Sequence, residues 1–64
     1  MTLQRAKELL WIQVDLGGGY NRNAARVILA EVQCSLDQVA VDQLIRELNL
    51  GDAFGFREGQ SFSI

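Results

Sequence analysis

The stretch SLDQVAVDQLIREL, residues 35–48, carries the clearest folding signals in the chain. Its apolar residues recur at the three- and four-residue spacing of a helix with one buried face. They are Ala40, Val41, Leu44, Ile45 and Leu48. Ser35 followed by Gln38 has the form of a capping box, in which each side chain accepts a hydrogen bond from the other residue's backbone N–H. We therefore predict a helix over about residues 36–50, which Gly51 is expected to end.

The N-terminal residues predict another helix, over about residues 2–15, with Thr2 as its N-cap. This helix is apolar on two sides. The first stripe suits the core of the domain and consists of Leu3, Ala6, Leu10 and Val14. The second stripe lies more than about 100° away around the helix and consists of Leu9, Ile12 and Leu16. A helix in a three-element domain can bury one side against its own fold, so the second stripe requires either the rest of this chain wrapped around the helix or another molecule.

A third helix is expected between these two, over about residues 23–33, with Asn21 or Asn23 as its N-cap. The residues expected on its buried face are Ala24, Ala25, Ile28, Leu29 and Val32. The residues expected on the opposite, solvent-facing side are Arg22, Arg26 and Gln33.

Residues 52–64 differ in character because they are rich in phenylalanine and glycine. A three-residue loop at 58–60 would place four apolar side chains on one face of a β-hairpin. These are Phe54, Phe56, Phe62 and Ile64. The alternative is an irregular aromatic tail laid over the core. The predicted fold class is therefore mainly α: one small three-helix domain over residues 1–64, with a C-terminal aromatic tail or a short β-hairpin.

The size of the chain restricts how such a domain is stabilised. With 64 residues it buries only about 60% of the surface that its unfolded chain exposes. Domains of this size usually depend on disulfides, a metal or a partner chain. One cysteine and no histidine exclude an intrachain disulfide and the usual zinc sites. A partner chain remains, and we expect a homodimer without cofactor or metal.

The residues expected to form the association surface are Leu9, Trp11, Ile12 and Leu16. Trp11 lies on the flank of the core stripe, so it suits either the core or the interface. A second candidate surface, for a partner or an anion, comprises Tyr20, Arg22 and Arg26. Glycines 17–19 precede it and would expose backbone N–H groups, although the spacing is neither a P-loop nor a dinucleotide fingerprint. The simpler alternative is a flexible reversal between two helices.

Catalytic chemistry is not expected. Cys34 has no histidine to activate it, and a buried cysteine that acts as a small hydrophobic residue is the better interpretation. Asp37, Asp42 and Glu47 do not share a helix face and are expected to be solvated, with Asp42 paired to Arg46 four residues later. A chain this short also has little volume for a ligand pocket. We therefore expect no enzymatic activity.

The function predicted is that of a small protein–protein interaction module: an adaptor, an inhibitor or a regulatory subunit. The alternative is a small dimeric helix-turn-helix or winged-helix-like DNA-binding regulator. Its DNA-contacting residues would be the basic ones of the N-terminal part: Arg5, Lys7, Arg22 and Arg26. The formal charge of −2 and the carboxylates of the predicted helix over residues 36–50 disfavour that alternative.

The sequence also indicates a compartment. No stretch approaches the roughly 20 consecutive apolar residues of a membrane span, and the first residues lack the pattern of a signal peptide. A single thiol is typical of a reducing compartment. We therefore expect no membrane association and a cytoplasmic location.

Overall fold

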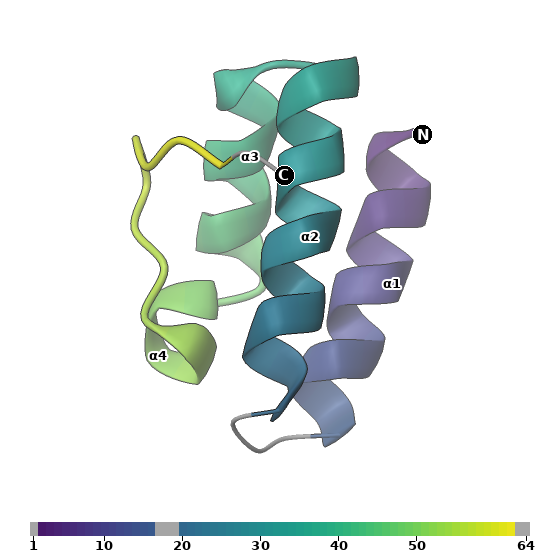
Figure 1. The fold of residues 1–64 in the computed structure, drawn as a ribbon, viewed down its shortest axis with the longest axis vertical. Helices are drawn as coiled ribbons and strands as arrows, with labels where there is room; N and C mark the ends of the chain where they lie inside the picture. Colours follow the sequence, from purple (N-terminus) through teal and green to yellow (C-terminus); the bar gives the residue numbers. More distant parts are fainter. Residues whose placement is uncertain (1, 17–19, 63–64) are drawn as a thin grey trace.

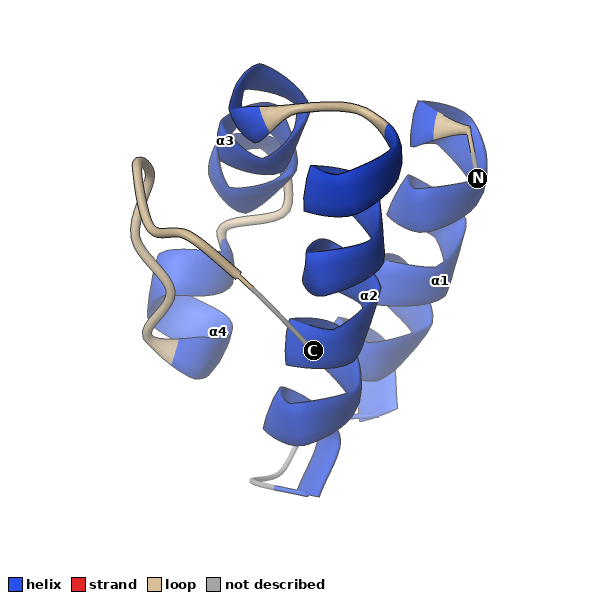
Figure 2. Ribbon diagram, turned by 45° about the horizontal axis from the view of Figure 1, so that its top comes forward, coloured by secondary structure: helices blue, strands red, loops and turns tan. Residues whose placement is uncertain are grey.

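The computed structural model of the protein describes residues 2–16 and 20–62. Four helices follow one another along the chain: α1 (Leu3–Leu16), α2 (Tyr20–Ser35), α3 (Gln38–Glu47) and α4 (Leu50–Phe54). α1 and α2 lie side by side, α3 packs against α2, and the residues after α4 run back along α3 (Figure 1). The described residues contain no strand (Figure 2), so the predicted fold class, mainly α, is confirmed.

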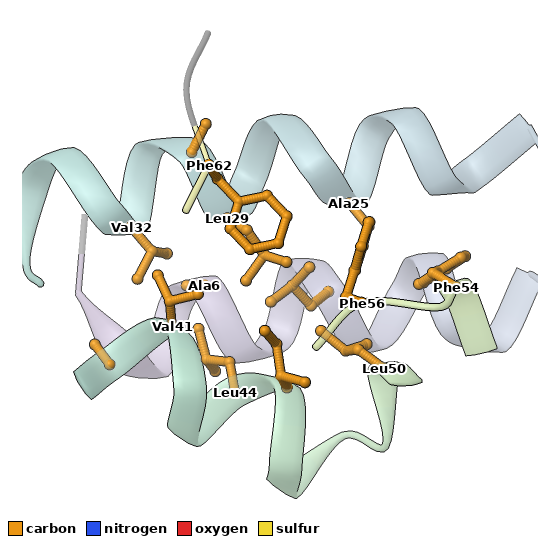
Figure 3. Close-up of a cluster of buried hydrophobic side chains, with 14 residues drawn as sticks. Ala6, Ala25, Leu29, Val32, Val41, Leu44, Leu50, Phe54, Phe56 and Phe62 are labelled. Atoms are coloured by element: carbon orange, nitrogen blue, oxygen red, sulfur yellow. The ribbon is translucent and has the colours of Figure 1, made fainter. Parts of the chain in front are cut away.

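One apolar core lies between the helices and the C-terminal residues (Figure 3). The buried residues are Ala6, Leu10, Ala25, Leu29, Ala30, Val32, Ala40, Val41, Leu44, Ile45, Leu50, Phe54, Phe56 and Phe62. Partly buried residues pack against them: Leu3, Val14, Ile28 and Leu48. The core faces predicted for the first and last of the three helices are therefore confirmed. On α2 the prediction for Ala24 is wrong, because Ala24 is exposed and Ala30 is buried.

α1 begins as the sequence predicts. The backbone N–H of Arg5 donates to Thr2 Oγ1 at 3.1 Å, which satisfies one of the amides left unpaired at a helix start. The backbone N–H of Ala6 bonds to the Thr2 carbonyl at 3.0 Å. Thr2 is thus confirmed as the residue that caps this helix.

α2 is longer than predicted at both ends. It begins at Tyr20, so Asn21 and Asn23 lie within its first turn, and the prediction that one of them is the N-cap is wrong. The Asn23 side chain is engaged differently, because its Oδ1 accepts from Arg26 Nε at 3.3 Å and from Arg26 Nη2 at 3.2 Å. At the other end the helix continues to Ser35.

α3 begins at a different cap from the one predicted. Asp37 is the N-cap, with extended backbone (φ −169°), and its Oδ1 accepts from the backbone N–H of Ala40 at 3.0 Å. The predicted capping box is wrong because Ser35 still belongs to α2. Aspartate and serine are about equally good caps, so local propensity did not distinguish them.

α3 also ends earlier than predicted, at Glu47. Asn49 adopts the left-handed conformation (φ 56°), which asparagine tolerates better than most residues, and the chain turns there into α4. Gly51 therefore lies inside α4 and ends no helix. A Cβ at Gly51 would lie 3.2 Å from the carbonyl oxygen of Phe56, so a side chain there would require a shift of a few tenths of an ångström. Gly55 (φ 79°) ends α4.

Of the two predicted alternatives, a β-hairpin and an irregular aromatic tail, the residues after α4 form the tail, since residues 55–62 contain no strand. Phe56 and Phe62 do come together, as a hairpin would have brought them, with ring centroids 5.3 Å apart in an edge-to-face arrangement. Phe54 packs 5.8 Å from Phe56. The predicted contact of Phe54 with Ile64 lies outside the described residues.

Candidate functional site

The outward side of α1 carries large apolar side chains that the domain leaves in solvent. Ile12 is 50% exposed, Leu16 is 68% exposed, and Leu9 is partly buried beside them. Leu9, Ile12 and Leu16 recur every three to four residues, so they form one continuous strip, which we call the outer stripe. Ala6 and Leu10 on the same helix are fully buried, which shows that α1 uses its other side for the core.

Trp11 is also exposed, at 55%, so the interpretation that places it in the core is wrong. It does not belong to the outer stripe, however. Along an α-helix each residue advances by about 100°, so Trp11 is rotated by about 100° from Ile12 and by about 140° from Leu16. The structure therefore divides the predicted association surface into the outer stripe and a separate exposed indole.

Charged side chains border the outer stripe. Arg5 lies four residues before Leu9, while Glu8 and Asp15 lie along one edge. All three charged residues are exposed. Within the described residues none of the three side chains has a hydrogen bond or an ion pair, so these charges remain available to a second molecule.

The second predicted surface, Tyr20, Arg22 and Arg26, is not assembled as expected. Arg22 Nε donates to the carbonyl oxygen of Phe54 at 2.9 Å, and its guanidinium lies 5.2 Å from the centroid of the Phe56 ring. Arg22 thus holds the residues after α4 against α2. Arg26 contacts Asn23. The Tyr20 side chain and the glycines at 17–19 lie outside the described residues.

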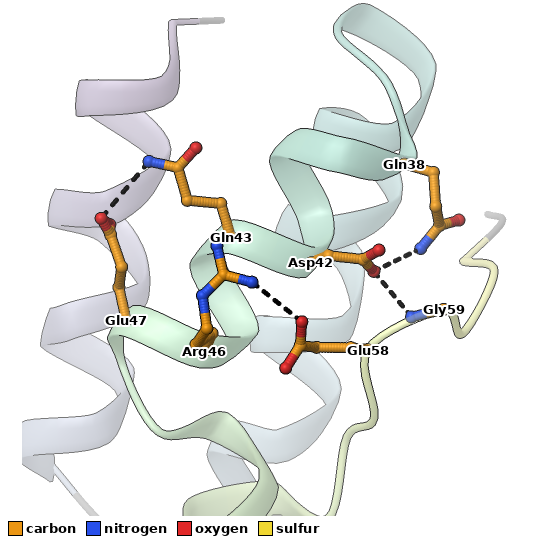
Figure 4. Close-up of polar contacts among 7 residues, drawn as sticks. All are labelled: Gln38, Asp42, Gln43, Arg46, Glu47, Glu58 and Gly59. Carbon is orange, nitrogen blue, oxygen red and sulfur yellow. Dashed lines mark hydrogen bonds and ion pairs between the residues drawn. The ribbon is translucent and has the colours of Figure 1, made fainter.

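The residues that hold the C-terminal part of the chain were not identified from the sequence. We call residues 55–62 the C-terminal strap. Three residues of α3 at a spacing of four each bind one strap residue. Arg46 Nη1 lies 3.0 Å from Glu58 Oε1, Asp42 Oδ1 accepts from Gly59 N at 2.7 Å, and Gln38 Nε2 donates to Gln60 O at 3.0 Å. The first two contacts are visible in Figure 4.

The strap also reaches α2. Gln33 Oε1 accepts from the backbone N–H of Phe62 at 3.0 Å, and Gln33 Nε2 donates to Gln38 Oε1 at 2.7 Å. Arg22 is exposed, as predicted, although it also contacts the Phe56 ring of the strap. Gln33 is only partly exposed, because it binds the strap at Phe62. The spacing of Gln38, Asp42 and Arg46 was the only signal in the sequence, and it does not reveal which segment binds to this row.

Asp42 is the one described group whose titration is clearly altered. The hydrogen bond from the Gly59 backbone lowers the pKa of Asp42 most, and the hydrogen bond from Gln38 Nε2 at 2.8 Å and the nearby Arg46 charge lower that pKa further. The predicted Asp42–Arg46 pair is replaced, since Arg46 pairs directly with Glu58. This network holds the strap against α3.

A polar contact also joins α1 to α3. Lys7 Nζ lies 3.5 Å from Glu47 Oε2. Gln43 Nε2 donates to Glu47 Oε1 at 3.3 Å, as Figure 4 shows. Both ends of the Lys7–Glu47 pair are substantially exposed, so it contributes little to stability. The pair with Glu47 does, however, occupy Lys7, one of the four basic residues considered for DNA contact.

Cys34 is exposed, so the prediction of a buried cysteine is wrong. Cys34 lies in the last turn of α2, which continues to Ser35. Two apolar side chains that follow Cys34 in the chain are also exposed, and the sequence did not predict this exposure. They are Leu36, at 42%, and Val39, at 71%.

The described part of the chain contains no group of three or more His, Cys, Asp or Glu residues placed to hold a metal ion. Among its helices, none combines the length and apolar character needed to cross a bilayer. No family model, no curated protein and no solved structure matches the chain.

Proposed function

We propose that the protein is a non-enzymatic protein–protein interaction module that forms a homodimer through the outer stripe of α1. The observation that carries the proposal is the exposure of Ile12 and Leu16 on a helix whose other side is already buried. Such side chains gain about 1.5–3 kcal/mol each when fully removed from water, so a continuous strip of them favours association.

The role of such a module is to present a surface. As an adaptor, an inhibitor or a regulatory subunit it needs no pocket, cofactor or reactive group of its own. Trp11 is also exposed, and tryptophan is enriched among the residues that anchor protein interfaces. It lies on a side of α1 that remains accessible in a dimer formed through the outer stripe, so it is available to a further partner. We place this role in the cytoplasm, a reducing compartment in which the exposed Cys34 persists as a thiol.

A DNA-binding regulator receives less support. Of the four basic residues considered for it, Lys7 is paired with Glu47, and Arg22 is bonded to the carbonyl of Phe54. No wing is formed by residues 55–62. We therefore propose the interaction module alone, and retention on duplex DNA at low salt that declines as salt is raised would contradict this choice.

Sedimentation equilibrium over a range of concentrations tests the homodimer. We expect the wild type to shift from monomer to dimer in the micromolar range and Ile12→Glu to remain a monomer at every concentration. Val39→Glu is the matched control, because Val39 is at least as exposed but lies on α3. Circular dichroism of both variants should match the wild type. A monomeric wild type, or a dimer that survives Ile12→Glu, would refute the proposal.

A further inference from the structure

We infer that the two copies pack their α1 helices antiparallel, with Arg5 of each copy beside Asp15 of the other. The inference rests on the proposed homodimer and specifies its geometry. It is argued from the spacing of the outer stripe, from the positions of the charges around it and from the exposure of Ile12, Leu16 and the charged side chains, beside which Leu9 is partly buried.

The outer stripe has the spacing of a helix–helix seam. Arg5, Leu9, Ile12 and Leu16 are separated by four, three and four residues, the alternation that places side chains along one line facing a second helix. The methylene stem of Arg5 extends the apolar surface by one turn, and its guanidinium reaches solvent at the edge. No residue of this row is needed elsewhere, since the core side of α1 uses Ala6 and Leu10.

An antiparallel pair of these helices brings apolar positions of one copy opposite apolar positions of the other. When Leu9 lies opposite Ile12 of the second copy, the two-fold axis places Ile12 opposite Leu9 at the same time. The same register places Arg5 opposite Leu16, immediately beside Asp15 of the second copy. Leu9 and Ile12 thus meet apolar side chains, Leu16 meets the methylene stem of Arg5, and each end of the contact acquires one pair of opposite charges.

The charges disfavour the parallel arrangement. Two α1 helices packed in parallel would place Arg5 of one copy next to Arg5 of the other, and likewise Asp15 next to Asp15. Neither side chain has an oppositely charged partner among the described residues that would compensate this repulsion. The macrodipoles of two parallel helices would also be aligned unfavourably, whereas antiparallel helices place opposite ends together. Charge complementarity therefore selects a second copy in the antiparallel orientation as the occupant of this face.

Charge reversal separates the two orientations. In the antiparallel dimer, Arg5→Asp or Asp15→Arg alone creates two like-charge contacts, so each should raise the dimer dissociation constant about 5- to 10-fold at low salt. The double variant restores both pairs and should return the constant to within about 2-fold of the wild type. Unfolding of α1 cannot explain a weaker dimer of these variants. Arg5→Asp places an acid in the first turn and Asp15→Arg places a base in the last turn, and both changes interact favourably with the helix dipole.

In a parallel dimer, each single reversal would replace one pair of like charges by another. In a dimer formed by another face, the reversed residue would not contact the second copy. In both cases the dimer dissociation constant would not change, and that result would overturn the inference. A monomeric wild type would overturn the proposed homodimer as well, so the two failures are distinguishable. A spin label at Gln4→Cys in a Cys34→Ser background gives a second measurement. Antiparallel helices place the two labelled residues about 20 Å apart along the axis, and labels in side-by-side contact would contradict the inference.

Discussion

Asp42 Oδ1 accepts a hydrogen bond from the backbone N–H of Gly59 at 2.7 Å, and this contact joins α3 to a strap residue 17 positions later in the chain. Gly59 has a positive φ of 86°, and Gln60 N bonds back to Arg57 O at 3.1 Å across the same turn. The turn therefore presents its amide to a single carboxylate. Because Phe56 and Phe62 lie on either side of it in the chain and complete the core, Asp42 helps to position the strap over that core.

Replacing Asp42 by alanine is expected to destabilise the domain by removing the acceptor of both Gly59 N and Gln38 Nε2. We expect a melting temperature several degrees below that of the wild type, measured by circular dichroism. Glu31→Ala is the control, since Glu31 is an exposed carboxylate for which no contact within the described residues is found. Equal melting temperatures for the two variants would show that the strap does not depend on Asp42.

Acid should remove the contribution of the Asp42 charge. The pKa of Asp42 is lowered in the folded state, chiefly by the Gly59 hydrogen bond, so the folded protein holds this proton less tightly than the unfolded chain. The stabilisation is fully present above the ordinary aspartate pKa of about 3.9 and is lost as the pH falls through the lowered value. Urea unfolding of the wild type and Asp42→Asn should therefore converge below about pH 3.9, and a constant difference throughout would contradict this assignment.

Arg22→Ala should cost about 1 kcal/mol of unfolding free energy, because it removes the bond to the Phe54 carbonyl and the contact with the Phe56 ring. Chemical denaturation measures the loss. Arg57→Ala removes a similar charge from an exposed residue whose side chain has no such contact within the described residues, and it should be close to neutral. If both variants lose the same free energy, net charge and not the contact is responsible.

Asp37→Ala should destabilise the domain by about 1 kcal/mol, the usual cost of removing an N-cap side chain. Ser35→Ala should have little effect, because Ser35 ends α2 and does not cap α3. Thermal unfolding of the two variants compares the observed cap directly with the one that the sequence favours. The opposite ranking would indicate that the capping box forms in solution.

The apolar faces of α1 and α3 were predictable because each depends on a periodic pattern within a single helix. Ala6, Leu10, Val41 and Leu44 are all buried as their spacing indicates. Helix ends were less predictable, because neighbouring residues compete for the same capping role. Asp37 and Ser35 both have suitable side chains, and only the length of α2 decides between them.

The position of the strap could not be derived from local patterns. Its contacts join residues distant in sequence, such as Arg22 with Phe56 and Gln33 with Phe62, and no periodicity links such pairs. The same difficulty explains why Arg22 was interpreted as a partner contact. The outer stripe and its angular separation from Trp11 both follow from the helical wheel, whereas the exposure of Trp11 becomes clear only from the structure.

The contacts of the strap also have a consequence for the order of events during synthesis. Arg22 and Gln33 have partners 32 and 29 residues later in the chain, so both side chains are synthesised before the groups that they bind. At about 5–20 residues per second, the delay amounts to some seconds. During that interval the Arg22 side chain lacks the Phe54 carbonyl and the Gln33 side chain lacks the Phe62 amide. These contacts can form only after residues 54–62 have been added, and a translational pause before Phe54 would delay them.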